Sequence, residues 1–365
     1  CSDFGANGRI DLSDGVGSVE LGEYSVTSPP AILGDLVFVG SAIGDNRATN
    51  LERGIVRAID ARTGSIQWLW DPIPKSVTDV AKATWSGDSN LNTGAANAWA
   101  PLTADPSSGL VFVPTSSPSP DFFGGERLGD NLYSNSIVAL DGSTGKVVWF
   151  QQLVHHDIWD YDVPAQPTLT TITRAGKTYK AVVVVTKTGM MFAFERSTGA
   201  PIYAIEERSV PQSDIPGEVT SPTQPFSAVA ALASQAPVST KDAFGVAFFD
   251  KWSCKRQIKR YRSKGMFTPP SLEGTIMRPS YAGGSNWGGV AIDPDRQIAV
   301  TNVNEVPALV RLIPRAELAR LKESGDLKGW QIAKQRGTPY SMARRIFLSP
   351  LNLPCTKPPW GDRKS

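Results

Sequence analysis

Three segments of this chain share one pattern, in which an alanine, an acidic residue, a Thr-Gly pair and an aromatic residue stand at fixed offsets. Self-similarity of this kind indicates an architecture of stacked units. An apolar strand ends at the acidic residue, the glycine supplies the positive φ of a tight turn, and a second strand carries the ring. A large ring at a fixed place can dock against the neighbouring unit of a radially stacked sheet protein. The segments are 58–68 (AIDARTGSIQW), 139–149 (ALDGSTGKVVW) and 193–203 (AFERSTGAPIY).

A second repeated element is a short run of β-branched and apolar residues, which favours strands. Such runs stand at 36–39 (LVFV), 110–113 (LVFV), 182–185 (VVVV) and 298–301 (IAVT). Helical periodicity is nearly absent, and only residues 314–324 (PRAELARLKES) predict a short surface helix that begins at a proline. Together these patterns predict an all-β fold, a β-propeller that occupies residues 1–365 as one domain.

Charge and hydropathy argue against some classes of function. The net charge is +2, so no global electrostatic argument indicates nucleic acid. The one local basic run, within residues 255–264, is interpreted as a solvated loop or edge strand. The longest apolar runs are too short to cross a bilayer, so no transmembrane segment is expected in this chain.

The three cysteines, Cys1, Cys254 and Cys355, are too few for a disulfide framework. One bridge is compatible with an oxidising compartment, and the sequence does not say which two residues form it. Cys1 fits either a lipidated mature N-terminus or a fragment that starts within a domain, and we favour the second interpretation.

Polar residues follow the apolar strands at the places where a propeller would deliver them to its central channel. Asp45 and Ser119 each lie six positions past the last valine of an LVFV run, and Asn46 and Asp121 lie close by. Carboxylate, amide and hydroxyl oxygens suit Ca²⁺ or Mg²⁺ better than zinc. The alternative is that these residues only form turns. Lys187 and Asn302 follow later strands in the same way.

The densest polar segment is 155–166 (HHDIWDYDVPAQ), which contains both histidines of the chain and three aspartates. Adjacent residues of an extended strand point to opposite faces, so the two histidines are not expected to bind one ion. No further histidine completes a zinc set. The segment is interpreted as a loop that presents one carboxylate inward as a general base, with a polar turn as the alternative.

Two tryptophans stand in glycine- or proline-bordered turns instead of in the repeated position. They are Trp99 (NAWAP) and Trp287 (SNWGG). A flat indole in the channel could stack on a planar cofactor, and ordinary packing within a blade is the alternative.

Taken together, these stretches resemble the pyrroloquinoline-quinone (PQQ) dependent, membrane-bound glucose dehydrogenase family, which also includes quinate dehydrogenases. The resemblance covers essentially the whole chain. The tryptophan repeat is shared by many quinoprotein propellers, whereas HHDIWDYDVPAQP and FTPPS together are much more specific. Other matching stretches are CSDFGANGRIDL, TSPPAILGDLVFVGSAIGDN, TKTGMMFAFERSTG, NWGGVAIDP and LSPLNLPCTKPPWG.

The resemblance implies an eight-bladed propeller with PQQ in a central funnel beside Ca²⁺ or Mg²⁺. It implies that Asp160 takes the proton of a sugar or polyol hydroxyl while hydride passes to the quinone, and that Lys187 hydrogen-bonds the quinone oxygens. The resemblance also places Asp45 and Asn46 at the metal, with Asn46 near the cofactor as well, and Ser119 as a metal-side hydroxyl where some relatives have threonine. It places Trp99 as a stacking partner of PQQ and Asn302 near PQQ. Trp287 is the further stacking candidate.

The family also implies a periplasmic location at the inner membrane and a membrane quinone as electron acceptor. Family members have sequence before Cys1 and after Gly361, so we expect a fragment whose ring lacks blades and has open sheet edges. Two alternatives remain, a non-catalytic periplasmic scaffold or assembly lipoprotein and a propeller hydrolase with paired carboxylates. Binding of PQQ distinguishes the dehydrogenase hypothesis from both alternatives.

Overall fold

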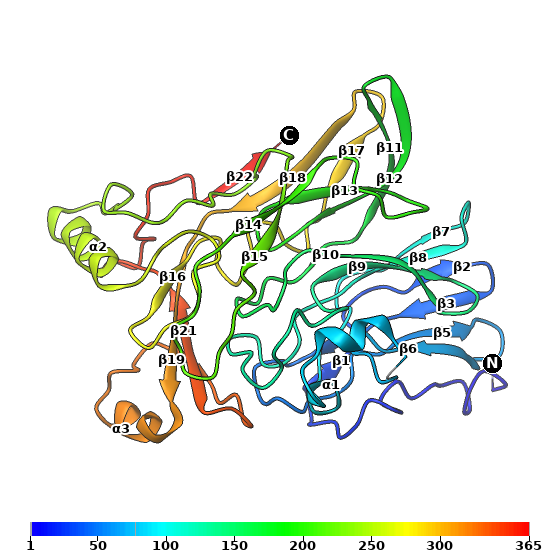
Figure 1. Cartoon of the computed structure of the whole chain (residues 1–365), viewed down its shortest axis with the longest axis horizontal. Helices are drawn as coiled ribbons and strands as arrows, with labels where there is room; N and C mark the ends of the chain where they lie inside the picture. Colours follow the sequence, from blue (N-terminus) through cyan, green and yellow to red (C-terminus); the bar gives the residue numbers. More distant parts are fainter. Residues whose placement is uncertain (1, 77, 365) are drawn as a thin grey trace.

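The computed structural model describes residues 2–76 and 78–364 of the chain. Within them, antiparallel sheets follow one another along an arc around the middle of the molecule (Figure 1). The all-β propeller prediction is confirmed. Two blades with four strands come first: β2 (Ala31–Leu33), β3 (Leu36–Val39), β5 (Val56–Asp60) and β6 (Ile66–Trp70), then β7 (Thr103–Asp105), β8 (Leu110–Pro114), β9 (Ser136–Asp141) and β10 (Val147–Gln152).

The later sheets are less regular, and their strands do not all follow in chain order. Two of the remaining sheets are short pairs, β1 (Tyr24–Ser25) with β4 (Ala42–Ile43) and β14 (Ile205–Ser209) with β15 (Thr223–Ser227). The other three sheets contain β11 (Thr168–Arg174), β12 (Lys177–Val185) and β13 (Met191–Glu195); β17 (Ala291–Asp293), β18 (Ile298–Asn304) and β22 (Gly361–Lys364); and β16 (Thr275–Met277), β19 (Ala308–Pro314), β21 (Tyr340–Ile346) and β20 (Gln331–Ala333).

The repeated tryptophans dock onto the turn of the next repeat, as the pattern predicts. The Trp68 indole N–H donates to the carbonyl of Gly142 at 2.9 Å, and the Trp149 indole N–H donates to the carbonyl of Arg196 at 3.0 Å. Each acceptor stands three residues before the glycine of a Thr-Gly turn. The indole rings cover those glycines, Gly145 and Gly199, whose φ angles are +70° and +71°.

A side chain at these glycines would meet the indole above it. A Cβ on Gly145 would lie 2.6 Å from the Trp68 ring, closer than any real contact. We expect Gly145→Ala to lower the free energy of unfolding by about 2–4 kcal/mol, because left-handed strain adds to overpacking. Gly176→Ala is the matched control, since Gly176 has a φ of +77° with no atom within 4 Å of its Cβ position. Urea denaturation measures both, and equal losses would contradict the docking role.

The helices differ from expectation in one place. The helix predicted at 314–324 is present as a 3₁₀ turn, Arg315–Glu317, followed by α3 (Leu318–Glu323). The basic run does not form a loop or an edge strand, because most of it belongs to α2 (Phe248–Arg260). Residues 78–98 contain a 3₁₀ turn, Val80–Thr84, and α1 (Ser89–Asn92). None of the described helices is long and apolar enough to cross a bilayer.

A disulfide joins Cys254 of α2 to Cys355 near the end of the described chain. Both cysteines are fully buried, in a small apolar cluster with Ile258 and Phe347. The bridge therefore ties α2 to the segment after β21 and settles the pairing that the sequence left open. Cys1, whose lipidation was one interpretation, lies outside the described residues.

Residues far apart in the sequence meet where the loop after β20 touches the loop after β4. The Arg336 N–H donates to the carbonyl of Arg47 at 2.8 Å, and the Thr49 N–H donates to the carbonyl of Arg336 at 2.9 Å. The Gln335 N–H likewise donates to the carbonyl of Asn46 at 3.2 Å. These contacts place the Asp45–Asn46 turn against β20 and β21, which supply the opposite wall of the site described next.

Candidate functional site

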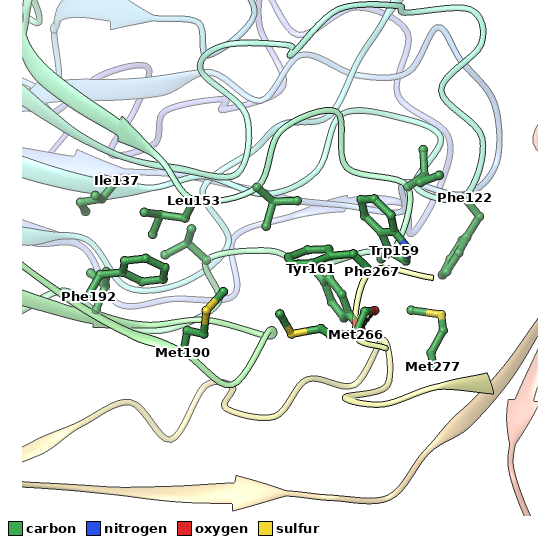
Figure 2. Close-up of a cluster of buried hydrophobic side chains, with 14 of the residues drawn as sticks. Phe122, Ile137, Leu153, Trp159, Tyr161, Met190, Phe192, Met266, Phe267 and Met277 are labelled. Carbon is green, nitrogen blue, oxygen red and sulfur yellow. Dashed lines mark hydrogen bonds between the residues drawn. The ribbon is translucent and has the colours of Figure 1, made fainter. Parts of the chain in front are cut away.

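The loop that carries Asp160 is held by two aromatic neighbours that enter the core. Trp159 and Tyr161 are fully buried and lie beside Phe267 in the largest apolar cluster (Figure 2). The Trp159 indole N–H donates to the carbonyl of Thr268 at 2.9 Å, and the Tyr161 hydroxyl donates to the carbonyl of Pro279 at 2.6 Å. Asp160 lies between them with a φ of +61°, a conformation that non-glycine residues rarely adopt. The flanking rings thus fix the strained residue that carries the carboxylate.

Asp157 is a structural carboxylate of the same loop. Its side chain accepts the backbone N–H groups of Trp159 at 2.9 Å and Tyr161 at 2.8 Å, and it also accepts from Asn135 and Ser117. A carboxylate with this many donors closes the loop on itself. The segment is therefore both a capped polar turn and the presenter of an inward carboxylate, the two interpretations that the sequence left open.

The two histidines of the loop have separate partners. The His155 ring lies within hydrogen-bond distance of Gln152 and Glu207, whereas the buried His156 ring contacts Glu218 at 2.8 Å and the carbonyl of Gly129 at 2.7 Å. They do not converge on a shared position.

Lys187 is the centre of the catalytic candidates. Its ammonium group lies between two carboxylates: it donates to Asp160 and lies 2.7 Å from Asp162. All three side chains are about nine-tenths buried or more. Arg344 of β21 reaches the other oxygen of Asp160 at 3.4 Å. The structure therefore brings together Asp160 and Lys187, the two residues predicted to be catalytic.

One ammonium group cannot neutralise both aspartates, so the pKa of Asp162 is lowered and the pKa of Asp160 is raised. Burial lowers the pKa of Lys187, but the two carboxylates outweigh burial and the net pKa is raised, so it stays cationic. Burial raises the pKa of Asp162, but Lys187 outweighs burial and the net pKa is lowered. Burial raises the pKa of Asp160 well above its usual value, and Asp162 and Asp45 add to the rise against the opposing charge of Lys187. A carboxyl group with a raised pKa suits a general base.

A second polar cluster lies next to this triad. Asn46 donates its amide N–H to Asp121, and it also contacts Asp45 at 3.3 Å. The Asn46 Oδ1 and Asp121 Oδ1 atoms are buried without any hydrogen-bond partner. Burial raises the pKa values of Asp45 and Asp121, and the charge of Asp45 adds to the rise at Asp121. Buried oxygens that lack donors, next to carboxylates that repel each other, fit a divalent cation with oxygen ligands.

Across residues 2–76 and 78–364 no group of three or more His, Cys, Asp or Glu side chains is arranged to hold a metal ion. The cluster at Asp45 contains two carboxylates and an amide. Further ligands for a cation would therefore come from backbone, water or a bound cofactor.

The remaining predicted residues lie at different distances from this centre. The Ser119 hydroxyl donates to the carbonyl of Thr49 at 2.6 Å and accepts from the N–H of Gly94 at 3.3 Å, so it already has two backbone partners. Trp287 is 54% exposed, and Asn302 is an exposed residue of β18, paired with Arg363 of β22. Their assignment to the cofactor remains a prediction.

Trp99 borders the triad. Its indole N–H donates to Asp162 at 3.1 Å, and the Lys187 ammonium lies 5.9 Å from its ring centroid. The nearby cavity of about 490 Å³ has Asp45 and Asn46 on one side and Arg344 of β21 on the other. Arg344, which lines this cavity, also reaches Asp160. Another cavity, of about 440 Å³ between β11 and β18, has no charged lining residue and offers no such chemistry.

Three contributors were not assigned roles from the sequence. Asp162 is two residues past Asp160, and no local sequence pattern indicates that it lies next to Lys187. Arg344 is 184 residues away from Asp160 and arrives from the last blade. Asp121 has a signal, because it follows the strand that ends at Val113 in the same way as Ser119 does.

The comparisons with known proteins agree with this geometry. Residues 1–364 match the family model described as "Glucose/ethanol/alcohol dehydrogenase, beta-propeller domain". The chain is 39% identical over 372 residues to quinoprotein glucose dehydrogenase A of Acinetobacter calcoaceticus, which covers 99% of this chain and 45% of the relative. It is 35% identical over 368 residues to quinate/shikimate dehydrogenase (quinone) of Acinetobacter baylyi, with the same coverage of both chains.

Among solved structures, the quinohemoprotein alcohol dehydrogenase of Comamonas testosteroni matches with a TM-score of 0.58 at 23% identity, over 93% of this chain and 44% of that one. This likeness shows the propeller fold. The chain spans about 45% of the length of the curated relatives named above. The structure has the propeller fold and the docked tryptophan repeats, and the family model matches residues 1–364. The chain therefore belongs to the β-propeller family of PQQ-dependent quinoprotein dehydrogenases.

Proposed function

We propose that this chain forms the PQQ-binding and catalytic part, a single propeller domain, of an oxidoreductase that oxidises a hydroxyl group of a sugar or polyol. The relatives are named for glucose and for quinate or shikimate, which are polyhydroxylated substrates. The observation that carries the proposal is the buried Asp160–Lys187 pair beside Trp99 and the oxygen-rich cluster.

Each residue has a role that follows from its surroundings. Asp160, with a raised pKa, takes the proton of the substrate hydroxyl. Lys187 stays cationic and would donate hydrogen bonds to the quinone oxygens, and Trp99 would offer an indole face for a planar ring. Bound PQQ supplies the hydride acceptor. Asp45, Asn46 and Asp121 would hold Ca²⁺ or Mg²⁺, and Ser119, Asn302 and Trp287 would complete the surroundings of the cation and cofactor.

We place the protein in the bacterial periplasm, with a membrane quinone as the electron acceptor. The Cys254–Cys355 bridge supports this location, because disulfides persist in oxidising compartments. The acceptor follows from a relative whose name specifies a quinone.

The test is a titration of the chain with PQQ in Ca²⁺ or Mg²⁺, followed by tryptophan quenching, with dye reduction by glucose and by quinate in the same samples. We expect Asp160→Asn to keep PQQ affinity within a few-fold while turnover falls about a thousandfold, since the base is lost. Asp45→Ala should abolish the metal dependence of PQQ binding. Asp295→Asn, at an exposed aspartate, is the matched control and should change neither quantity.

Failure of PQQ to bind this chain calls for the same titration on a chain extended at both ends. If PQQ binds neither, the dehydrogenase proposal is wrong and the non-catalytic scaffold becomes the better explanation. Normal turnover of Asp160→Asn would remove Asp160 from its role as base.

A further inference from the structure

Helix α2 (Phe248–Arg260) exposes three large aromatic side chains. Phe248 is 88% exposed, Trp252 is 61% exposed and Phe249 is 47% exposed. The helix lies at one extremity of the molecule, on the left of the view (Figure 1). A soluble protein rarely exposes a group of large rings unless the group contacts something.

The same exposed face is strongly basic. Five cationic residues, Lys251, Lys255, Arg256, Lys259 and Arg260, are exposed on this helix. Within residues 2–76 and 78–364, no carboxylate forms an ion pair with any of the five. The whole chain has a net charge of only +2, so the helix concentrates positive charge.

The opposite face anchors the helix to the protein. Asp250, Cys254 and Ile258, spaced by four, are buried. The Asp250 carboxylate accepts the N–H groups of Val246 and Leu351, each at 3.3 Å, and Cys254 is bridged to Cys355. The aromatic and basic face therefore points outward from a helix that is covalently fixed.

The two kinds of side chain divide along the helix. The three aromatic residues lie in the first turn and a half, and four of the five cations lie at or beyond Lys255. Aromatic rings favour the boundary between headgroups and acyl chains, and lysine and arginine pair with anionic headgroups above it.

We propose that α2 is an interfacial helix that docks this chain on an anionic phospholipid surface. Phe248, Phe249 and Trp252 enter the boundary region, and the five cations bind headgroup phosphates. The net positive charge of the face complements anionic lipid. The inference does not rest on the proposed redox function, and its test uses neither PQQ nor turnover.

The experiment is co-sedimentation of the full 365-residue chain with phosphatidylcholine vesicles, with or without phosphatidylglycerol. We expect binding to the mixed vesicles and little to phosphatidylcholine alone. The triple change Lys255→Gln, Arg256→Gln and Lys259→Gln should weaken binding on the order of a hundredfold, since each cation near the surface contributes. Its matched control changes three exposed lysines elsewhere, Lys146, Lys180 and Lys322, to glutamine, and should stay within about twofold.

A second variant replaces Phe248, Phe249 and Trp252 with serine, and we expect its binding to the mixed vesicles to weaken at least tenfold. Its control, Leu21→Ser with Ile32→Ser, removes exposed apolar side chains far from α2 and should keep binding. Brominated lipids should quench wild-type fluorescence more than that of Trp252→Phe, because the indole lies among the acyl chains.

Three results would overturn the proposal. One is absence of binding to phosphatidylglycerol vesicles. Another is an equal loss in the variants and their matched controls, or equal quenching of wild type and Trp252→Phe. The third is sedimentation velocity that shows a dimer without lipid and a monomer for the aromatic variant, because the face would then be covered by a second copy of the chain.

Discussion

Lys187→Met should lower the free energy of unfolding at neutral pH by about 3–5 kcal/mol, as expected when one partner is removed from a buried ion pair. The ammonium group separates Asp160 from Asp162, and without it two buried carboxylates face each other with only Arg344 near Asp160. Lys180→Met, on the strand β12 that precedes Lys187, is the matched control. Lys180 is exposed, so its loss should cost less than about 0.5 kcal/mol.

The pH dependence gives this prediction a second readout. In the variant we expect both carboxyl groups to have pKa values above those of the unfolded chain, because burial and mutual repulsion raise them and only Arg344, beside Asp160, opposes the rise. A group with a raised folded-state pKa stabilises the fold below its unfolded pKa and loses that contribution as the pH rises through its folded pKa. The deficit of the variant should therefore shrink as the pH falls from 8 toward 5.

Urea denaturation at several pH values measures the deficit directly. Adding Asp162→Asn to Lys187→Met should recover part of the lost stability, whereas Asp162→Asn alone should destabilise the wild type. A deficit that is constant with pH, or a second change that costs the same in both backgrounds, would show that the three side chains do not act as a unit.

Removing the disulfide should have an effect of similar size. Cys254 and Cys355 are 101 residues apart, and chain-entropy arguments give about 4–5 kcal/mol for a loop of that length, within an observed range of about 2–5 kcal/mol. Cys254→Ser with Cys355→Ser should therefore shift the urea midpoint strongly downward. Both sulfurs lie in a buried apolar cluster, so the hydroxyl groups add to the loss.

The wild type treated with reductant is the internal control and should approach the double variant. Peptide mass spectrometry should recover Cys254 and Cys355 in one linked peptide before reduction and in two afterwards. A wild-type midpoint that does not move on reduction would mean that the bridge adds no stability.

Asp160 and Lys187 could be singled out from the sequence, because each belongs to a local motif and matches the family resemblance. Asp160 stands in a segment dense in aspartates and flanked by aromatic rings, and Lys187 follows a buried valine strand at a turn. The pairing of Asp160 with Lys187 was not predictable from spacing. It depends on how two blades face each other.

Helix α2 escaped prediction for a physical reason. Its buried face contains one aspartate, one cysteine and one isoleucine, so the usual apolar period is missing. The disulfide and the hydrogen bonds of Asp250 stabilise the helix in place of an apolar stripe.

The sequence by itself determined the repeating unit, because the strand, the glycine turn and the docking indole are all set by residues within eleven positions of one another. It determined the propeller for the same reason, and the family through the resemblance of longer stretches such as HHDIWDYDVPAQP. Only the tertiary structure decided that Asp162 and Arg344 surround the Asp160–Lys187 pair, that Asp121 joins Asp45 and Asn46, and that Cys254 bonds Cys355. These contacts join residues that are distant in the chain, and their geometry follows from the packing of whole blades, which no local pattern encodes.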